Sequence, residues 1–105
     1  LAASVKMVQK QITIDTIKEA VCGYYGLDTS RLLERTRKRE VVVARQMSMY
    51  LAKKYTSLSL AGIGDVLGKK DHATVLHACK TITEQIGVDK KLRSDLEEIE
   101  QRIQG

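Results

Sequence analysis

The residues best suited to chemistry follow a glycine and two lysines, within the segment 68–77. Asp71, His72 and Thr74 carry groups that accept or donate hydrogen bonds. The small side chain of Ala73 lets another molecule approach closely. An aspartate just before an amphipathic stripe caps a helix, so the next three residues are expected in the first turn of that helix. There a carboxylate can accept from cytosine, an imidazole can donate to guanine or thymine, and a threonine methyl can contact a thymine methyl.

The elements around this segment have the spacing of a helix-turn-helix. Ser59 is expected to cap a short helix that ends at Gly68, and Lys70 lies in the three-residue turn that follows. Leu76, in the second helix, is expected to serve mainly in packing. The face that anchors this helix is expected to consist of Val75, Ala78, Cys79, Ile82 and Ile86. A helix anchored on one face, with its first turn outward, suits the major groove of DNA.

Positive charge is concentrated in one quarter of the chain. The 105 residues carry a formal net charge of +5, whereas residues 31–54 contain eight basic and two acidic residues. Arg37 lies in the densest part of this zone, 35–39, where four of the five residues are basic. Mutual repulsion predicts an exposed loop there. A localized basic zone on a globular domain indicates a polyanionic partner.

Apolar spacing predicts helices for most of the remaining chain, over 13–25, 29–33, 41–55 and 90–103. Thr13 and Asp28 are the expected caps of the first two, and Gly26 ends the first. The lack of proline and the presence of only four aromatic residues, all tyrosine, disfavour β-sandwiches and barrels. The sequence therefore predicts an all-α fold, a compact bundle of about six helices that contains a helix-turn-helix.

Several residues are expected to serve in packing alone. Cys22 and Cys79 lie among apolar residues and are expected to be buried free thiols. Met49 is expected to fill the core together with Met47. The core-facing stripe of the central helix is expected to consist of Ala44, Met47, Ser48, Leu51 and Tyr55.

The same residues bear on three other functions, namely metal binding, catalysis and the docking of a protein. His72 and His77 are five residues apart, so they do not share a helical face as a zinc pair would, and no metal site is expected. His77 is expected to be a partly buried packing residue or a neighbour of a phosphate. No nucleophile adjoins a base, which predicts that the chain is not an enzyme. A different kind of function stays open: a protein partner could dock on the apolar face of the last helix, which consists of Leu92, Leu96, Ile99 and Ile103.

Several stretches of the sequence, in order, resemble the C-terminal DNA-binding domain of the DnaA family of bacterial chromosomal replication initiators. They are residues 12–15, 44–47, 50–52, 59–60, 63–65 and 68–78. The resemblance covers 12 to about 86 and is carried most specifically by the last stretch. It implies a Trp-repressor-like helix-turn-helix domain over 12–105 that binds double-stranded DNA at short origin boxes (DnaA boxes).

The resemblance also implies what the chain lacks. An ATP-binding module of the family oligomerizes on DNA, but no phosphate-binding glycine-rich motif is present here. We therefore expect no cofactor in this fragment, with ATP and Mg²⁺ confined to the missing module. Residues 1–11 are expected to be a connector to that module, with helical spacing between Val5, Val8 and Ile12. The fragment is expected to be monomeric, and the full-length protein cytoplasmic and associated with the nucleoid.

Individual contacts follow from the resemblance, residue by residue. Arg37 matches an arginine that enters the minor groove. Base contacts are assigned to Arg37, Asp71, His72, Ala73 and Thr74. Contacts with the DNA backbone are assigned to Arg45, Gln46, Lys53, Ser59, Leu60 and Lys70. Two positions depart from the family pattern, since Ala73 replaces a common threonine and Ala61 stands where many members have proline. Sequence preference is expected to be relaxed at the base pairs that these residues would meet.

Overall fold

A computed structural model describes residues 12–34, 37–68 and 71–104 of the chain. In those ranges it contains five α-helices, one 3-10 helix and no strand. In chain order these are α2 (Ile14–Tyr25), η1 (Thr29–Leu33), α3 (Arg39–Tyr55), α4 (Leu60–Val66), α5 (His72–Gln85) and α6 (Lys90–Gln104). The predicted all-α bundle of about six helices is confirmed. The connector expected over 1–11, and the turn residues Lys69 and Lys70, lie outside the described residues.

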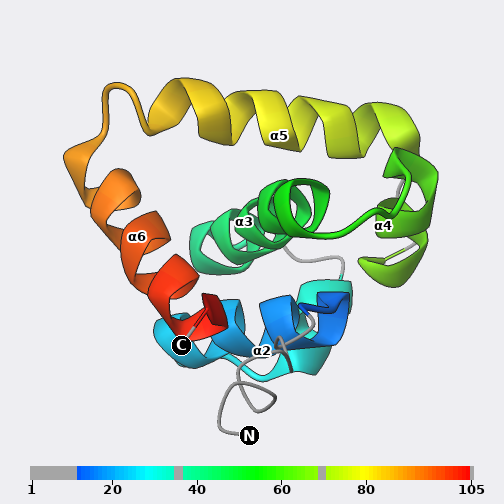
Figure 1. The fold of residues 1–105 in the computed structure, drawn as a ribbon, viewed down its shortest axis with the longest axis horizontal. Helices are drawn as coiled ribbons and strands as arrows, with labels where there is room; N and C mark the ends of the chain where they lie inside the picture. The colour runs from blue at the N-terminus through cyan, green and yellow to red at the C-terminus, as the bar shows by residue number, and fades with distance from the viewer. Residues whose placement is uncertain (1–11, 35–36, 69–70, 105) are drawn as a thin grey trace, which may run out of the picture.

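The central element is α3, which passes between α5 on one side and α2 on the other (Figure 1). α4 packs on α5, and α6 packs on α2. Contact on two sides buries more of α3 than the single predicted stripe. Met49 and Ala52 are buried together with Ala44, Met47 and Leu51. The core is therefore built around α3, and both Met47 and Met49 fill it as predicted.

Local caps set most helix starts. The hydroxyl of Thr13 accepts from the amide of Thr16 at 3.2 Å, and the carboxylate of Asp28 accepts from the amide of Ser30 at 3.0 Å. Gly26 ends α2 with φ +71°, a left-handed conformation that side chains with a Cβ rarely adopt. These starts and this stop are confirmed, because each needs only residues within one turn.

The start of α3 differs from the prediction. The helix begins at Arg39 rather than at residue 41, because the carbonyl of Lys38 accepts from the amides of Val41 and Val42, at 3.1 and 2.9 Å. Arg39 therefore belongs to the first turn of α3, not to the loop. The fixed amide hydrogen bonds outweigh the repulsion within the basic run, since the side chain of Arg39 is exposed to solvent, where charge repulsion is screened.

The apolar face of α6 faces inward. Leu96, Ile99 and Ile103 are at most 5% exposed, and Leu92 is half-buried. The hypothesis that this face docks a protein partner is therefore wrong, because α2 and the rest of the core already cover it. None of the helices in the described ranges is long and apolar enough to cross a membrane.

Polar contacts also hold α6 in place. Asp95 is only 6% exposed and accepts hydrogen bonds from the hydroxyls of Tyr24 at 2.6 Å and Tyr25 at 3.3 Å. Farther along α6, Glu100 accepts from the hydroxyl of Tyr55 at 2.8 Å and pairs with Lys54 at 2.6 Å. α6 is thus joined to the ends of both α2 and α3.

Candidate functional site

The first turn of α5 is exposed and capped as predicted. Oδ1 of Asp71 accepts from the amide of Thr74 at 2.8 Å and from its hydroxyl at 2.7 Å. The hydrogen bonds from Thr74 lower the pKa of Asp71, because they stabilise the ionised carboxylate. All four residues of the segment, Asp71, His72, Ala73 and Thr74, are exposed. The turn thus presents a carboxylate, an imidazole and a threonine side chain to solvent.

The rest of α5 is anchored in the core. Val75 is 0% exposed, Ala78 and Ile82 are buried, and α5 lies directly against α3. Cys79 is half-buried rather than buried, and its thiol donates to the carbonyl of Met49 at 3.7 Å. Burial raises the pKa of Cys79, so it has the character of a packing residue. Cys22 is buried, as predicted.

Two packing roles expected on α5 are wrong. Leu76 is 55% exposed although it was expected to pack, and His77 is exposed, which excludes the first of its two expected roles, that of a partly buried packing residue. On a helix, positions three and four residues apart share a face, so Leu76 lies on the outward face with His72 and Ala73. Only the positions in register with Val75 reach the core. The phosphate-neighbour role of His77 stays a prediction.

A small hollow joins α5 to α3 next to this exposed turn. It measures about 190 Å³, and its lining includes Thr74 and His77 from α5 and Arg45 and Gln46 from α3. The structure thus brings one predicted base contact together with two predicted backbone contacts. His77 was not assigned to the site, although its i, i+3 spacing from Thr74 is a sequence signal that could have placed it there.

Arg45 makes contacts that the sequence did not predict. Its Nε donates to the carbonyl of Leu32 at 2.8 Å, and its Nη2 donates to the carbonyl of Glu34. The side chain is half-buried, and burial lowers its pKa. Leu32 and Glu34 precede Arg45 by more than ten residues, so no local pattern could have revealed these partners.

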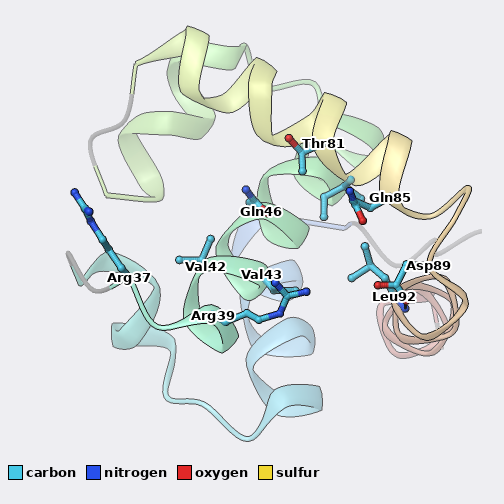
Figure 2. A pocket seen from close by; sticks show the side chains of 10 residues that line it. Arg37, Arg39, Val42, Val43, Gln46, Thr81, Gln85, Asp89 and Leu92 are labelled. Atoms are coloured by element: carbon cyan, nitrogen blue, oxygen red, sulfur yellow. Dashed lines mark hydrogen bonds between the residues drawn. The ribbon is translucent and has the colours of Figure 1, made fainter.

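Arg37 is exposed and lies next to Lys38, the residue from which α3 starts. A groove of about 420 Å³ runs from it between α3, the last turn of α5 and the start of α6. In Figure 2, Arg37 extends away from the other labelled side chains, whereas Arg39 lies along the groove near Val43. Arg37 and Arg39, two of the three arginines of the basic run, therefore point to different places.

The remaining predicted contacts are spread over the ends of α3 and α4. Lys53 is exposed in the last turn of α3. Ser59 is exposed and caps α4 by accepting from the amide of Gly62 at 3.0 Å, and Leu60 is half-buried. Lys70 lies outside the described residues. Among the residues that the structure does describe, no group of three or more His, Cys, Asp or Glu is placed to hold a metal ion.

Comparison with known proteins identifies the family of this fold and site. The family model of the bacterial dnaA protein helix-turn-helix matches residues 14–82. The chain is 54% identical over 96 residues to the chromosomal replication initiator protein DnaA of Bacteroides fragilis, with 91% of this chain and 20% of that protein covered. Identity to the protein of the same name from Flavobacterium psychrophilum is 46% over 99 residues, covering 94% of this chain and 21% of that protein.

A more distant relative agrees with these two. The chromosomal replication initiator protein DnaA of Chloroflexus aurantiacus is 42% identical over 96 residues, with 91% of this chain and 20% of that protein covered. The chain thus spans about a fifth of the length of the curated relatives that it matches. Both the family model and these identities extend over most of the chain, from α2 through α5. The chain therefore belongs to the bacterial DnaA helix-turn-helix family.

Proposed function

We propose that this chain binds double-stranded DNA sequence-specifically, at short origin boxes, in the initiation and regulation of bacterial chromosome replication. The observation that carries the proposal is the contrast within α5: its first turn is exposed while Val75, Ala78 and Ile82 are buried. A rigidly anchored helix that presents polar groups from its first turn is suited to the major groove. Membership of a family whose relatives are named chromosomal replication initiators supports the same function.

The proposed base contacts lie in the first turn of α5. Both hydrogen bonds from Thr74 end on Oδ1 of Asp71, so Oδ2 is the oxygen proposed to accept from a cytosine amino group. Because the Thr74 hydroxyl donates its proton to Asp71, Thr74 offers DNA only lone pairs and a methyl group, which suits contact with a thymine methyl. His72 is proposed to donate to guanine or thymine.

Arg37 is proposed to enter the adjacent minor groove. It is exposed and next to the N-terminus of α3, outside the helix-turn-helix itself. A·T-rich minor grooves are narrow and carry an enhanced negative potential that attracts an arginine. Recognition would then use two grooves, and the box would contain an A·T-rich step beside the segment read by α5.

Contacts with the DNA backbone are proposed for residues around the two parts that are proposed to contact bases, the first turn of α5 and Arg37. The Ser59 oxygen accepts from Gly62, which leaves its hydroxyl proton available for a phosphate oxygen. Phosphate contacts of this kind position a protein without reading sequence. The full proposed set is Arg45, Gln46, Lys53, Ser59, Leu60 and Lys70.

Two alanines are proposed to relax the preference of this chain for particular base pairs in the DNA box. Ala73 is exposed beside His72 but has no group that hydrogen-bonds to a base. Ala61 is exposed on α4 and offers only a methyl for van der Waals contact. The loss of one good base contact costs roughly 1–3 kcal/mol of discrimination. Base pairs opposite these two residues should therefore tolerate substitution better than the others.

The chain is proposed to act as one part of a longer protein. Its relatives are about five times as long as the matched region. The ATP- and Mg²⁺-dependent steps, and oligomerization on DNA, are proposed to belong to other domains, with this chain supplying the DNA contact without catalysis. The proposed site of action is the nucleoid in the cytoplasm.

A competition experiment tests the proposal. A labelled duplex with an origin box is bound by the chain at moderate salt and competed with unlabelled box, scrambled box and random duplex. We expect the unlabelled box to compete at least about tenfold better, because each mismatched base pair costs roughly 1–3 kcal/mol. The variant Glu97→Gln, on the exposed face of α6, serves as a matched control and should bind as the wild type does. Equal competition by all three duplexes would contradict the proposal.

A further inference from the structure

We propose that Leu76 is a specificity-determining residue, whose side chain contacts the methyl group of a thymine in the major groove. The inference rests on the proposed function, because it adds a base contact to the helix that is proposed to enter that groove. The base contacts already proposed lie in the first turn of α5 and at Arg37. Leu76 lies one turn farther along α5, and its contact is apolar rather than a hydrogen bond.

Leu76 takes no part in holding α5 in the bundle. It is 55% exposed and outside the core cluster, whereas Val75 and Ala78, on the anchoring face, are 0% and 3% exposed. Four large apolar residues in the described part of the chain are exposed, and the other three are Leu33, Leu58 and Val88. Those three lie outside the α-helices. Within the described ranges, Leu76 is thus the one large apolar side chain that an α-helix directs into solvent.

The position of Leu76 on α5 places it beside the proposed base contacts. His72 precedes it by four residues and Ala73 by three, so the three residues share one face of the helix. Side chains of a helix lean toward its N-terminus, so the Leu76 side chain covers the turn that holds His72 and Ala73. Because the side chain of Ala73 is only a methyl group, Ala73 and Leu76 form an apolar strip next to the His72 imidazole.

The chemistry of the major groove determines which group this strip would meet. Base edges there present nitrogen and oxygen donors and acceptors, and the thymine methyl is the apolar group among them. A leucine placed against a cytosine or adenine amino group would displace water from a donor without replacing its hydrogen bond, which weakens binding. Against a thymine methyl, two apolar surfaces leave water together. Leu76 should therefore favour thymine at one base pair.

Replacement of thymine by deoxyuridine tests the contact, because it removes the methyl and keeps the hydrogen-bonding groups of the base. The thymines of the origin box are replaced one at a time, and affinity for each duplex is measured by fluorescence anisotropy. Leu76→Ala shortens the side chain without lowering helix propensity, and Leu76→Met keeps an apolar side chain of similar size. Val88→Ala, between α5 and α6, is the matched control at another exposed apolar residue.

Thr74 is also proposed to contact a thymine methyl, so its effect has to be separated from that of Leu76. Thr74→Ser keeps the hydroxyl that donates to Asp71 and removes the methyl. Thr74 and Leu76 are two residues apart, about 200° around the helix, so their side chains meet different bases. Each variant should abolish the effect of deoxyuridine at its own thymine and keep the effect at the other.

We expect the wild type to lose roughly fourfold in affinity when the thymine opposite Leu76 becomes deoxyuridine, which is the size of one buried methyl group. Leu76→Ala should bind those two duplexes equally, and Leu76→Met should still distinguish them. Val88→Ala should behave as the wild type does. The proposal is overturned if Leu76→Ala keeps every deoxyuridine effect of the wild type.

Two further outcomes separate this inference from the proposed function and from the fold. A wild-type chain that binds the origin box and a scrambled duplex equally overturns the proposed function. A chain that prefers the box, but in which no deoxyuridine effect depends on Leu76, overturns the inference alone. Because Leu76 is 55% exposed, Leu76→Ala should unfold at the same urea concentration as Val88→Ala. A clearly lower midpoint would mean that Leu76 serves in packing, which contradicts the inference.

Discussion

Asp71 illustrates how one side chain can serve folding and a proposed contact at once. Its Oδ1 accepts both the amide and the hydroxyl proton of Thr74, which starts α5 and fixes the Thr74 rotamer. The same hydrogen bonds keep the group ionised and therefore able to accept from a base. Capping and the proposed base contact would not compete, because the cap uses Oδ1 and the proposed contact would use Oδ2.

The acid sensitivity of the fold should change when Asp71 is replaced. Its pKa is lowered in the folded chain by the hydrogen bonds from Thr74. Such a group stabilises the fold fully above its unfolded pKa, about 3.9, and the contribution is lost as pH falls through the lower folded pKa. We expect Asp71→Asn to lose stability less steeply than the wild type below about pH 4, as measured by urea unfolding.

Glu84→Gln is the charge-matched control for that experiment, since Glu84 is exposed near the other end of α5. It removes one negative charge without removing the cap. If Asp71→Asn and the wild type lose stability in parallel between about pH 6 and pH 2, the range in which carboxylates titrate, the Asp71 carboxylate does not contribute to the acid sensitivity of the fold.

His72 should determine base preference rather than overall affinity. It is exposed in the first turn of α5, next to Ala73, whose side chain is small. We expect His72→Ala to weaken binding to the origin box roughly tenfold, the size of one base contact, and to leave binding to a scrambled duplex almost unchanged. Fluorescence anisotropy on the two duplexes measures both affinities.

Lys53→Ala provides the contrast for His72→Ala. A phosphate contact positions the protein without reading bases, so its loss should weaken binding to both duplexes alike. A loss of equal size on both duplexes for His72→Ala would mean that His72 does not read a base.

At the scale of elements, the attachment of α6 depends on a polar cluster within an apolar interface. Asp95 accepts from Tyr24 and Tyr25, whose rings meet edge to face with centroids 5.2 Å apart. The hydrogen bond to Asp95 raises the pKa of Tyr24, and burial raises the pKa of Tyr25. Both hydroxyls are therefore kept protonated, as donors to a carboxylate that is itself 6% exposed.

Loss of this acceptor should destabilise the bundle. Asp95→Ala leaves two hydroxyls in the interface between α2 and α6 with no acceptor at that place. Each hydrogen bond contributes about 1 kcal/mol net and both tyrosines are half-buried, so we expect a decrease of about 1–2 kcal/mol in the free energy of unfolding, measured with urea. Asp95→Asn keeps an acceptor oxygen and should lose less.

Gln101→Ala is the matched control for Asp95→Ala, because Gln101 is exposed on the same helix. Surface substitutions of this kind usually change stability by less than about 0.5 kcal/mol. If Asp95→Ala loses no more than Gln101→Ala, the tyrosine cluster does not hold α6 to α2.

Over the whole molecule, charge is distributed unequally between its helices. Eight of the 18 basic residues lie in 31–54, which includes the last three residues of η1 and nearly all of α3. Residues 89–105, which contain α6, carry four basic and five acidic residues. We therefore propose that the face formed by α3 and α5 attracts DNA. Under the same proposal, α6 lies on the side of the molecule away from the phosphates.

The dependence of binding on salt should report this distribution. The logarithm of the binding constant falls with the logarithm of salt concentration with a slope of about −0.9 for each phosphate contact on duplex DNA. We expect Lys53→Gln to make the slope shallower by about 0.9, as measured by anisotropy titrations from low to moderate salt. Lys90→Gln, an exposed lysine of α6, should leave it unchanged. Equal slopes for the two variants would contradict the proposed orientation.

The sequence by itself determined where α2, η1, α4 and α5 begin and what the chain resembles. The caps at Thr13, Asp28, Ser59 and Asp71 each bond to an amide two or three residues later, so a short stretch of sequence contains all of the interacting groups. The stretch 68–78 likewise holds the family resemblance in one continuous segment. These features could be predicted because nothing distant in the chain contributes to them.

Only the tertiary structure decided which faces are covered and where the long side chains end. The apolar spacing of α6 is equally consistent with a free docking face, but contact with α2 buries it. Leu76 is apolar and yet 55% exposed, since the orientation of α5 on α3 selects the register of Val75. The guanidinium of Arg45 reaches carbonyls that precede it by 13 and 11 residues. Each outcome depends on how whole helices pack, and packing brings together residues that no local pattern relates.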